Sequence, residues 1–389
     1  MKSLFKKLLS QKFINNFYHL PKAVLANIFY GFPARGLKVI GVTGTDGKTT
    51  TVNMIYQILK DAGKRVSMVS TINAPGFHVT SPDPFTIQKF AKAAQKNGDE
   101  YLVLEVTSHA LDQYRFWGIK FDIGVITNIT HEHLDYHKTF ENYSDSKLKL
   151  IKNAETAIVN QEIQGIQGKI ITFGLEKGDF NQKDVRLKLK IPGNYNIENA
   201  LSALSVAYVS GIDKSIARKT LENFQGVKGR MEEVKNRKGI KIIVDFAHTP
   251  NGLEQALKTL HSHIKSGKLI VLIGCEGYRD VDKRAMMGEV AQSLSNIVIV
   301  TSVDPRGQLE IINRQIFKGA AKMGAKIGIN FFVVNDREKA IALSINNLAR
   351  KGDTVGIFGK GHEISMNLDG KKEIPWSDFD AVKRVLNGR

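Results

Sequence analysis

One stretch, GVTGTDGKTTTVN at residues 41–53, constrains the fold of this 389-residue chain more than any other. It follows an apolar run and looks like a phosphate-binding loop, although a standard loop of this kind would need a glycine at Val42. Its glycines let backbone N–H groups close around phosphates, Lys48 adds a positive charge, and Thr49 offers a hydroxyl to Mg²⁺. The residues that follow predict a helix whose N-terminus favours anions. The sequence therefore predicts a strand, a nucleotide-binding loop and a helix in succession.

Short apolar runs alternate with helical segments along the rest of the chain. The first series contains YLVLEVT, FDIGVITNIT and TAIVN; a second begins after GVKGRMEEV and contains KIIVDFA, LIVLIGC, NIVIVTS and DTVGIFG. Runs of this kind are typical of buried parallel strands. We expect an α/β protein with a central doubly wound, P-loop-type ATPase domain at 37–228, a C-terminal Rossmann-like domain at 229–389 and an N-terminal segment at 1–36.

Composition narrows the class of protein. A formal net charge of +18 suits an anionic partner such as a nucleotide, and no motif for binding nucleic acid stands out, so we expect no nucleic-acid partner. The single cysteine, Cys275, cannot form an internal disulfide, and no signal pattern or membrane-spanning apolar run is present. These features predict a cytoplasmic protein.

The first 38 residues differ from the rest because they contain six lysines, one arginine and no acidic residue. Apolar side chains recur there at roughly helical spacing, which predicts a basic amphipathic helix that Pro21 interrupts. The apolar positions are Leu4, Phe5, Leu8, Leu9, Phe13, Phe17 and Leu20. Two roles fit: peripheral contact of residues 1–20 with an anionic membrane, or packing on the ATPase domain.

Candidate metal ligands follow two of the predicted strands. Glu105 ends one apolar run, and His131, His133, Asp135 and His137 fall within seven positions after another. Parallel sheets bind ligands at the carboxyl ends of their strands, although some of these histidines are expected to be solvated bystanders.

At this point a family resemblance can be stated. The ordered motifs GVTGTDGKTTT, LEVTSHALDQYR, TNITHEHLDYH, PGNYNIENALSAL, GRMEEV, DFAHTPNGL, GCEGYRD, TSVDPRG and GKGHE resemble the Mur ligases of peptidoglycan synthesis. The likeness covers roughly residues 37–389 and is greatest to members that add the third residue of the stem peptide, of the diaminopimelate-adding type. The loop of this family has the form G-x-x-G-T-x-G-K-T, which accounts for the unusual glycine spacing.

The resemblance implies ATP-dependent amide formation through an acyl phosphate, in which Mg²⁺ and cations neutralise charge and no covalent nucleophile is needed. By similarity, the metal ligands and catalytic residues are Thr49, Glu105, His133 and Lys147, together with Lys48. Lys147 matches a lysine that this family carries as a carbamate. The ATP-binding residues implied are Gly44, Thr45, Gly47, Lys48, Thr49, Thr50, Asn199, Arg230, Asp245 and His248.

The resemblance also implies a site for a muramyl-peptide donor and one for an amino acid. Donor contacts are assigned to Thr80, Ser81, Thr107, Gln113 and Arg115. Arg279, Asp304, Arg306, Gly359 and Glu363 are assigned to the amino acid. Because a guanidinium pairs with a carboxylate bidentately, Arg306 in SVDPRG favours meso-diaminopimelate over lysine. Arg279 would then meet a carboxylate and Glu363 an ammonium of this amino acid.

The sequence departs from the family pattern at several places. Asp46 replaces the common Asn, Phe246 the usual Tyr, and Glu276 and Tyr278 stand where the pattern has smaller or acidic residues. A separate UDP-binding N-terminal domain is usual in the family, whereas about 36 residues precede the first predicted strand. Three alternatives follow: a different or lipid-linked peptide donor, a folylpolyglutamate synthetase, which the SHAL and GKGHE motifs disfavour, and a non-catalytic nucleotide-binding scaffold at the membrane.

Overall fold

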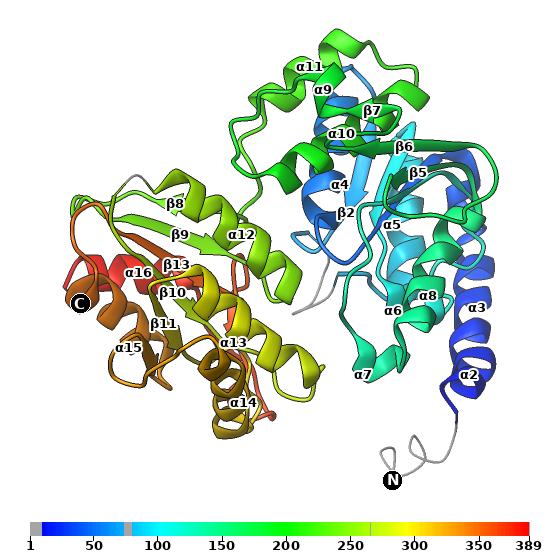
Figure 1. Ribbon diagram of the computed structural model, residues 1–389. Helices are drawn as coiled ribbons and strands as arrows, with labels where there is room; N and C mark the ends of the chain where they lie inside the picture. The colour runs from blue at the N-terminus through cyan, green and yellow to red at the C-terminus, as the bar shows by residue number, and fades with distance from the viewer. Residues whose placement is uncertain (1–9, 74–79, 265, 389) are drawn as a thin grey trace. The chain divides into compact units, whose positions relative to one another are not determined.

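The computed structural model describes residues 10–73, 80–264 and 266–388, which divide into two compact units (Figure 1). The first unit takes in the described residues up to Ile129, together with Thr139–Lys190 and Tyr195–Phe224. The second consists of Thr130–Lys138, Ile191–Asn194 and the described residues from Gln225 onward. The chain therefore passes between the units several times. Among the described residues, no helix combines the length and the apolar character needed to cross a bilayer.

The first unit is built on a seven-stranded parallel sheet with the order β2-β3-β1-β4-β5-β6-β7. Its strands include the runs predicted from their apolar character. They are β1 (Lys38–Thr43), β2 (Val66–Val69), β3 (Tyr101–Glu105), β4 (Phe121–Ile126), β5 (Ala154–Asn160), β6 (Ile170–Gly174) and β7 (Phe180–Asn181). β1 lies between β3 and β4, so the phosphate loop that follows it emerges at the centre of the sheet.

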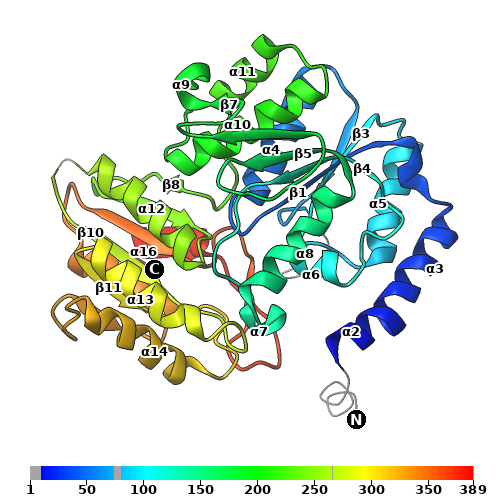
Figure 2. The same cartoon turned by 45° about the vertical axis from the view of Figure 1, so that its right-hand side comes forward.

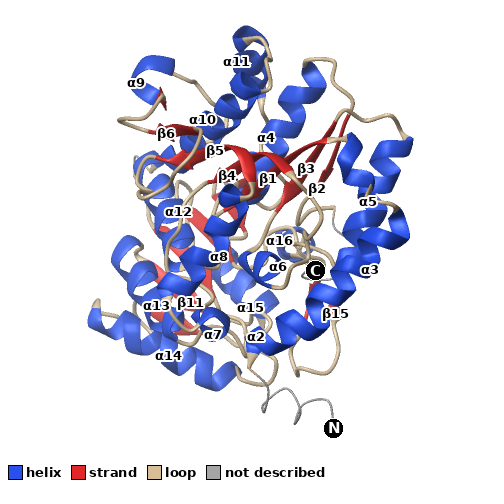
Figure 3. Ribbon diagram, turned by 90° about the vertical axis from the view of Figure 1, so that its right-hand side faces the viewer, coloured by secondary structure: helices blue, strands red, loops and turns tan. Residues whose placement is uncertain are grey.

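Helices cover both faces of this sheet, which confirms the predicted doubly wound architecture (Figures 2 and 3). The helices of this part of the chain are α4 (Lys48–Asp61), α5 (Pro84–Lys96), α6 (Ser108–Asp112), α8 (Phe140–Lys152), α9 (Gln182–Val185), α10 (Asn194–Val209) and α11 (Lys214–Asn223). On one face, Leu102 and Leu104 of β3 pack with Ile87 and Ala91 of α5 in a buried cluster. Burying these apolar side chains supplies the main force that holds the helix on the sheet.

The amino-terminal helix runs farther than predicted. α2 (Gln11–Ile14) continues through a π-helical turn, Asn15–His19, into α3 (Leu20–Tyr30), so the prediction that Pro21 interrupts the helix is wrong. The proline ring lacks an N–H and would clash with a carbonyl of the preceding turn in a regular α-helix. The wider turn, in which the N–H of Leu20 bonds to the carbonyl of Asn15, coincides with this position and relieves the conflict. The predicted apolar positions before residue 10 lie outside the described residues.

The second unit has a six-stranded sheet with the order β12-β11-β10-β13-β9-β8, in which only β8 runs antiparallel to its neighbour. Its strands are β8 (Glu232–Val234), β9 (Lys241–Asp245), β10 (Leu269–Ile273), β11 (Ile297–Val300), β12 (Phe331–Val333) and β13 (Thr354–Phe358), with a small hairpin of β14 (Ser365–Met366) and β15 (Ile374–Pro375). Its helices are α7 (Leu134–His137), α12 (Pro250–His263), α13 (Asp282–Leu294), α14 (Leu309–Lys322), α15 (Arg337–Ala342), the π-helical Leu343–Leu348 and α16 (Asp378–Leu386).

Two apolar clusters lie on opposite faces of this sheet because successive side chains of a strand point to opposite sides. In β10, Val271 joins a cluster with residues of α12, α13 and α14, whereas Ile270 and Leu272 join one with residues of α15 and α16. The apolar run LIVLI of this strand is therefore buried on both faces, as expected for a central strand.

A buried ion pair joins α15 to α16. Arg337 donates to both carboxylate oxygens of Asp378 at 2.7 Å, and both side chains are nearly inaccessible to water. Replacing Asp378 with asparagine leaves a buried guanidinium without its counter-charge, so we expect the free energy of unfolding of the second unit to fall by about 3–5 kcal/mol. Urea unfolding followed by the fluorescence of Trp376, in a Trp117→Phe background, measures the loss.

The matched control is the exposed pair between Arg384 and Glu338, which joins the same two helices at 2.7 Å. Arg384→Ala should change the unfolding free energy little, because solvent screens an exposed pair. An equal loss in the two variants would contradict the importance given to burial.

Candidate active site

The phosphate loop is closed by backbone geometry that glycine supplies. Gly44 and Gly47 have φ of 153° and 82°, and Gly47 precedes the first residue of α4. Lys48 folds back over the loop, its Nζ donating to the carbonyls of Gly44 at 2.9 Å and Thr45 at 2.7 Å. The N-terminus of α4 and this cation thus converge on the loop, which is the arrangement that binds phosphates.

The loop is also packed too closely for any side chain larger than hydrogen. A Cβ added at Gly44 would lie 1.8 Å from Oγ1 of Thr127, and one at Gly47 would lie 2.2 Å from Oδ1 of Asn199. The cradle therefore exposes backbone N–H groups rather than side chains, and its residues fit the phosphates of a nucleotide. Asn199, in α10, is buried beside the loop and accepts a hydrogen bond from Thr51 at 3.3 Å.

Glu105, the last residue of β3, joins this loop to the neighbouring strand ends. Its carboxylate is buried; Oε1 accepts from the hydroxyls of Thr49 at 3.0 Å and Thr71 at 2.9 Å, and Oε2 accepts from the N–H of Thr71 at 2.8 Å. A hydroxyl and a carboxylate at this spacing supply the hard oxygen ligands that Mg²⁺ prefers. The structure thus brings together two of the metal ligands expected from the sequence.

Lys147, in α8, lies beside the same loop. Its side chain is buried, with Nζ 2.6 Å from the carbonyl of Gly44 and 4.4 Å from the centroid of the Tyr143 ring. The hydroxyl of Tyr143 lies 2.9 Å from Oγ1 of Thr45. The structure therefore places Lys147 at the phosphate loop, where a solvated surface lysine would not be found.

The residues expected to contact the donor form an adjoining cluster. Ser81 donates to the carbonyl of Glu105 at 3.0 Å and accepts from the N–H of Thr107 at 3.0 Å. Arg115 donates to the carbonyl of Ser81 at 2.5 Å and to Oε1 of Gln113 at 2.7 and 3.1 Å. Thr80 belongs to the same network through a 3.1 Å bond from Thr71.

The segment Thr130–Lys138, which carries His133, makes its contacts in the second unit. Glu132 and Lys283 form a buried ion pair at 2.9 Å, and Asp280 accepts from the N–H of Leu134 at 3.3 Å. Burial opposes the charged form of Lys283, but Glu132 and Glu276 outweigh it and raise its pKa. His133 itself has a left-handed φ of 58°, an uncommon conformation for a residue that is not glycine.

Three other candidate ligands lie in this segment: His131, Asp135 and His137. His131 has Nε2 3.6 Å from the Asp280 carboxylate, His137 is buried, and Asp135 is in the first turn of α7. Within the described residues, no three His, Cys, Asp or Glu side chains gather in a way that could hold a metal ion.

Three residues assigned to ATP lie around the end of β9. Asp245 accepts from the N–H groups of Met231 and Ala247, both at 2.7 Å, and fixes the turn that carries His248. The guanidinium of Arg230 lies over the ring of Phe246 at 4.3 Å from its centroid. Phe246, which replaces the usual tyrosine, thus supports Arg230 by a cation–π contact.

Glu276 is an unexpected neighbour of Arg279 and Arg306, two of the residues assigned to the amino acid. Its carboxylate lies 2.9 Å from Nε of Arg279 and 3.7 Å from a guanidinium nitrogen of Arg306. Burial opposes its ionisation, but Arg279, Lys283, His248 and Arg306 outweigh that effect and lower its pKa to about 2. Both arginines are therefore gathered around one permanent negative charge.

The remaining residues of this set are held by Lys360, which is fully buried. It donates to Asp304 at 2.9 Å and pairs with Glu363 at 2.7 Å. Asp304 is also fully buried and accepts from the N–H of Asn367 at 2.8 Å, which fits a role in shaping the loop that presents Arg306. Gly359, with φ of 102°, bonds through its N–H to the carbonyl of Asp245 at 3.1 Å.

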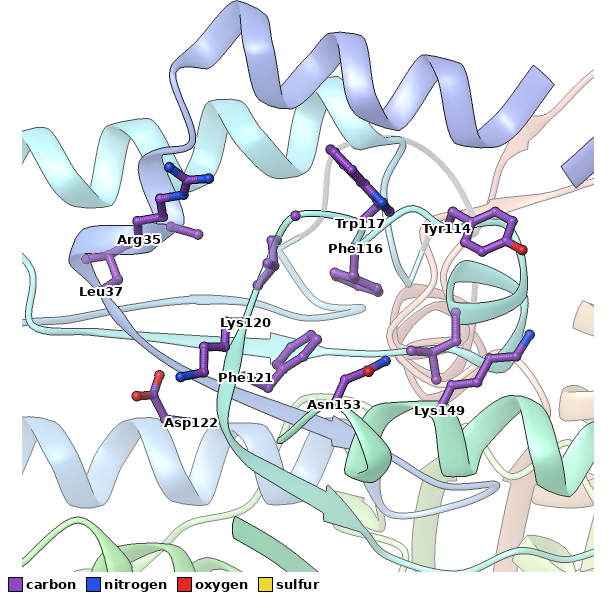
Figure 4. A pocket seen from close by; sticks show the side chains of 14 residues that line it. Arg35, Leu37, Tyr114, Phe116, Trp117, Lys120, Phe121, Asp122, Lys149 and Asn153 are labelled. Carbon is purple, nitrogen blue, oxygen red and sulfur yellow. The ribbon is translucent and has the colours of Figure 1, made fainter. Parts of the chain in front are cut away.

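A separate pocket of about 830 Å³ lies in the first unit at the start of β4 (Figure 4). Its cations already have partners: Lys120 pairs with Glu155 at 2.5 Å and Lys149 with Asp112 at 3.1 Å. The amino ends of strands lie opposite the end at which α/β sheets bind their ligands. This pocket is therefore not the nucleotide site.

Several residues of the site were not anticipated from the sequence. The loop is held by Asn128, whose Oδ1 accepts from the N–H of Asp46 and whose carbonyl accepts from the N–H of Thr45, both at 3.0 Å. Thr127 donates to the carbonyl of Asp46 at 2.6 Å. Thr127 and Asn128 directly follow the apolar run FDIGVI, and polar residues at the end of a predicted strand were the signal that could have identified them.

Comparison with known proteins agrees with this geometry. The Mur ligase middle domain matches residues 42–207, and the Mur ligase, glutamate ligase domain matches residues 229–361. The chain is 37% identical, over 94% of its own length and 80% of the relative's, to a UDP-N-acetylmuramoyl-L-alanyl-D-glutamate--2,6-diaminopimelate ligase of Clostridium tetani.

Solved structures show the same relationship. The structure of a UDP-N-acetylmuramoyl-L-alanyl-D-glutamate--2,6-diaminopimelate ligase matches with a TM-score of 0.57 and 29% identity, covering 90% of this chain and 78% of that one. The folylpolyglutamate synthase of Mycobacterium tuberculosis matches with a TM-score of 0.65 and 16% identity, covering 95% of both chains. At that low identity, the second likeness is one of fold alone.

The close packing of the phosphate loop can be tested with Gly47→Ala. A Cβ at this position meets Asn199, so we expect the loop to shift and the affinity for ATP to fall roughly tenfold or more, or about 1.4 kcal/mol. Binding of a fluorescent ATP analogue measures the change. Gly63→Ala is the control, because Gly63 also has positive φ, 74°, but no atom lies within 4 Å of its added Cβ. Equal losses in both variants would show that backbone strain, and not the clash, weakens binding.

Proposed function

Since the chain belongs to the Mur ligase family and is an ATP-dependent amide ligase, we propose that it adds meso-diaminopimelate to UDP-N-acetylmuramoyl-L-alanyl-D-glutamate in peptidoglycan synthesis. The observation that carries the proposal is the phosphate loop with the hydroxyl of Thr49 bonded to buried Glu105. Ligases similar to this chain are named for these two substrates. The enzyme forms an amide between the donor's terminal carboxylate and an amine of the amino acid.

Bound Mg²⁺-ATP would supply the phosphoryl group that activates the donor carboxylate as an acyl phosphate, with ADP as the leaving group. The amine of the amino acid then attacks the acyl carbon and displaces inorganic phosphate, which forms the amide. The backbone of the loop and Lys48 hold the phosphates and offset their charge. Thr49 and Glu105 hold the first metal ion, and Asn199, Arg230, Asp245 and His248 bind the rest of the nucleotide. No protein nucleophile is required, and burial raises the pKa of Cys275, the single thiol, to about 11.

Lys147 is proposed to act as a carbamate and His133 as a ligand of the second metal ion. The neutral amine of a lysine reacts with CO₂ to form a carbamate, an anionic group with two oxygens, and releases a proton. Lys147 is suited to this change because its buried Nζ already lies beside the loop, 2.6 Å from Gly44 O. A negative group there would complement the metal ions that a nucleotide brings.

The donor is proposed to lie along the cluster of Thr80, Ser81, Thr107, Gln113 and Arg115, where Arg115 meets its anionic groups. The amino acid is proposed to bind in the second unit. Arg306 pairs with the distal carboxylate of meso-diaminopimelate, Arg279 with a second carboxylate and Glu363 with an ammonium. Glu276 pairs with both arginines, and substrate carboxylates compete with it for them.

The enzyme is further proposed to work in the cytoplasm, with a peripheral contact between residues 1–20 and the anionic face of the membrane. Residues 10–20 of this segment are described by the structure, and Phe13 and Phe17 among them are exposed and stacked with ring centroids 4.4 Å apart. Exposed aromatic side chains in an acid-free segment support such a contact.

A phosphate-release assay with the UDP-muramyl dipeptide and a panel of amino acids tests the proposal. We expect ATP-dependent release with meso-diaminopimelate and little with lysine. Release only with a different or lipid-linked donor would identify another Mur-type substrate. Absence of release with every donor and acceptor would instead favour a nucleotide-binding scaffold.

The carbamate assignment predicts the behaviour of Lys147→Ala. This variant should lose nearly all ligase activity, because the anionic ligand is missing, and acetate or formate should restore part of it. ATP binding serves as the folding control. Full activity in the unrescued variant would exclude the carbamate role.

The selectivity assignment predicts the behaviour of Arg306→Ala in competition between meso-diaminopimelate and lysine. Leaving a carboxylate without its bidentate partner costs roughly 1–3 kcal/mol, so the preference for diaminopimelate should fall about 5- to 150-fold. Arg314→Ala, which removes an exposed arginine from α14 of the same unit, is the control for net charge. An unchanged preference in Arg306→Ala would show that another residue selects the amino acid.

A further inference from the structure

The continuous helix from Gln11 to Tyr30 is fixed to the first unit by one face. Asn15, Ala23, Ala26 and Asn27 are buried on that face. Asn15 donates to the Asp112 carboxylate at 2.7 Å, and Asn27 donates to the carbonyl of Trp117 at 2.6 Å. Figures 1 and 2 show α2 and α3 along the outer edge of this unit, with α3 beside α5. The helix is therefore an integral part of the unit.

Its opposite face carries large apolar side chains that the described residues of the first unit leave open to water. This outer stripe consists of Phe13, Phe17, Leu25, Ile28 and Phe29, which are 43%, 69%, 59%, 61% and 73% exposed. A water-exposed stripe of such side chains marks a surface that binds a partner or a membrane. The stripe extends well beyond residue 20.

The π-helical turn keeps these positions on one side of the helix. In a regular α-helix each residue advances about 100°, so the stripe would drift around the axis between Phe13 and Phe29. The turn at Asn15–His19, bonded from residue i to i+5, inserts about one extra residue and rotates the following helix back by a similar angle. The aromatic residues before the turn and the apolar residues after it then share a face.

The charge of the surrounding sequence favours an anionic surface as the partner. Residues 1–38 contain seven basic residues and no acidic one, and Lys12 is exposed within the helix itself. The neighbouring helix α5 adds exposed Lys89 and Lys96. Apolar side chains with cations around them are typical of helices that lie in the interface of a bilayer.

We propose that the outer stripe docks the enzyme on an anionic lipid surface, with the helix lying parallel to the membrane and the first unit held behind it. This deepens the peripheral contact proposed above, because it places three of the five residues of the stripe after residue 20. The ligase activity does not depend on it, so the two proposals can fail separately.

The test is flotation of the full-length protein with vesicles of phosphatidylglycerol and phosphatidylethanolamine. Wild type should float with these vesicles and not with phosphatidylcholine vesicles. Leu25→Gln/Ile28→Gln, which keeps helix-forming residues, should weaken the binding roughly tenfold or more. Lys12→Glu should weaken it several-fold, with the largest effect at low salt.

Ile327→Gln/Ile329→Gln is the matched control, since these residues are 64% and 69% exposed but belong to the second unit. It should float like wild type, and all variants should keep wild-type ligase activity and thermal unfolding midpoints. The proposal is overturned if wild type fails to float, or if the stripe variant floats as well as the control. Concentration-dependent dimers that the stripe variant abolishes, without vesicle binding by wild type, would assign the face to a second copy of the chain instead.

Discussion

The first unit depends on the buried carboxylate of Glu105. It accepts hydrogen bonds from Thr49 at the start of α4 and from the backbone and side chain of Thr71 after β2. The carbonyl of the same residue accepts from Ser81, which in turn orders Thr107 at the start of α6. A single residue at the end of one strand thus fixes the positions of the phosphate loop and the neighbouring donor cluster relative to each other. Three hydrogen bonds to the carboxylate offset much of the cost of removing its charge from water.

The second unit balances its charges differently. The carboxylate of Glu276 pairs with Arg279 and Arg306; burial opposes its ionisation, but the surrounding cations outweigh burial and lower its pKa. Without that carboxylate, two guanidiniums would face each other across a partly buried space and repel. Glu276 therefore offsets part of the positive charge of both arginines.

Much of the architecture could be predicted from the sequence because each buried strand appears in it as a short apolar run. These runs predicted the central strands of both sheets. The glycines around Lys48 predicted the phosphate loop. The helix through Pro21 could not be predicted, since a π-helical turn leaves no simple signature. Glu132 and Lys283 are 151 positions apart, so nothing local in the sequence reveals their buried pairing. The roles proposed for the site residues rest on the family resemblance and not on local patterns in the sequence.

The path of the chain has a consequence for cutting the protein into pieces. Thr130–Lys138 leaves the first unit after β4, makes its contacts in the second unit and returns to α8. A fragment that starts at Gln225 would contain Lys283 but would lack Glu132, the counter-ion that this lysine has in the whole chain. The second unit is therefore not encoded by one continuous stretch of sequence, and a fragment cut at the boundary near Gln225 omits part of its interior.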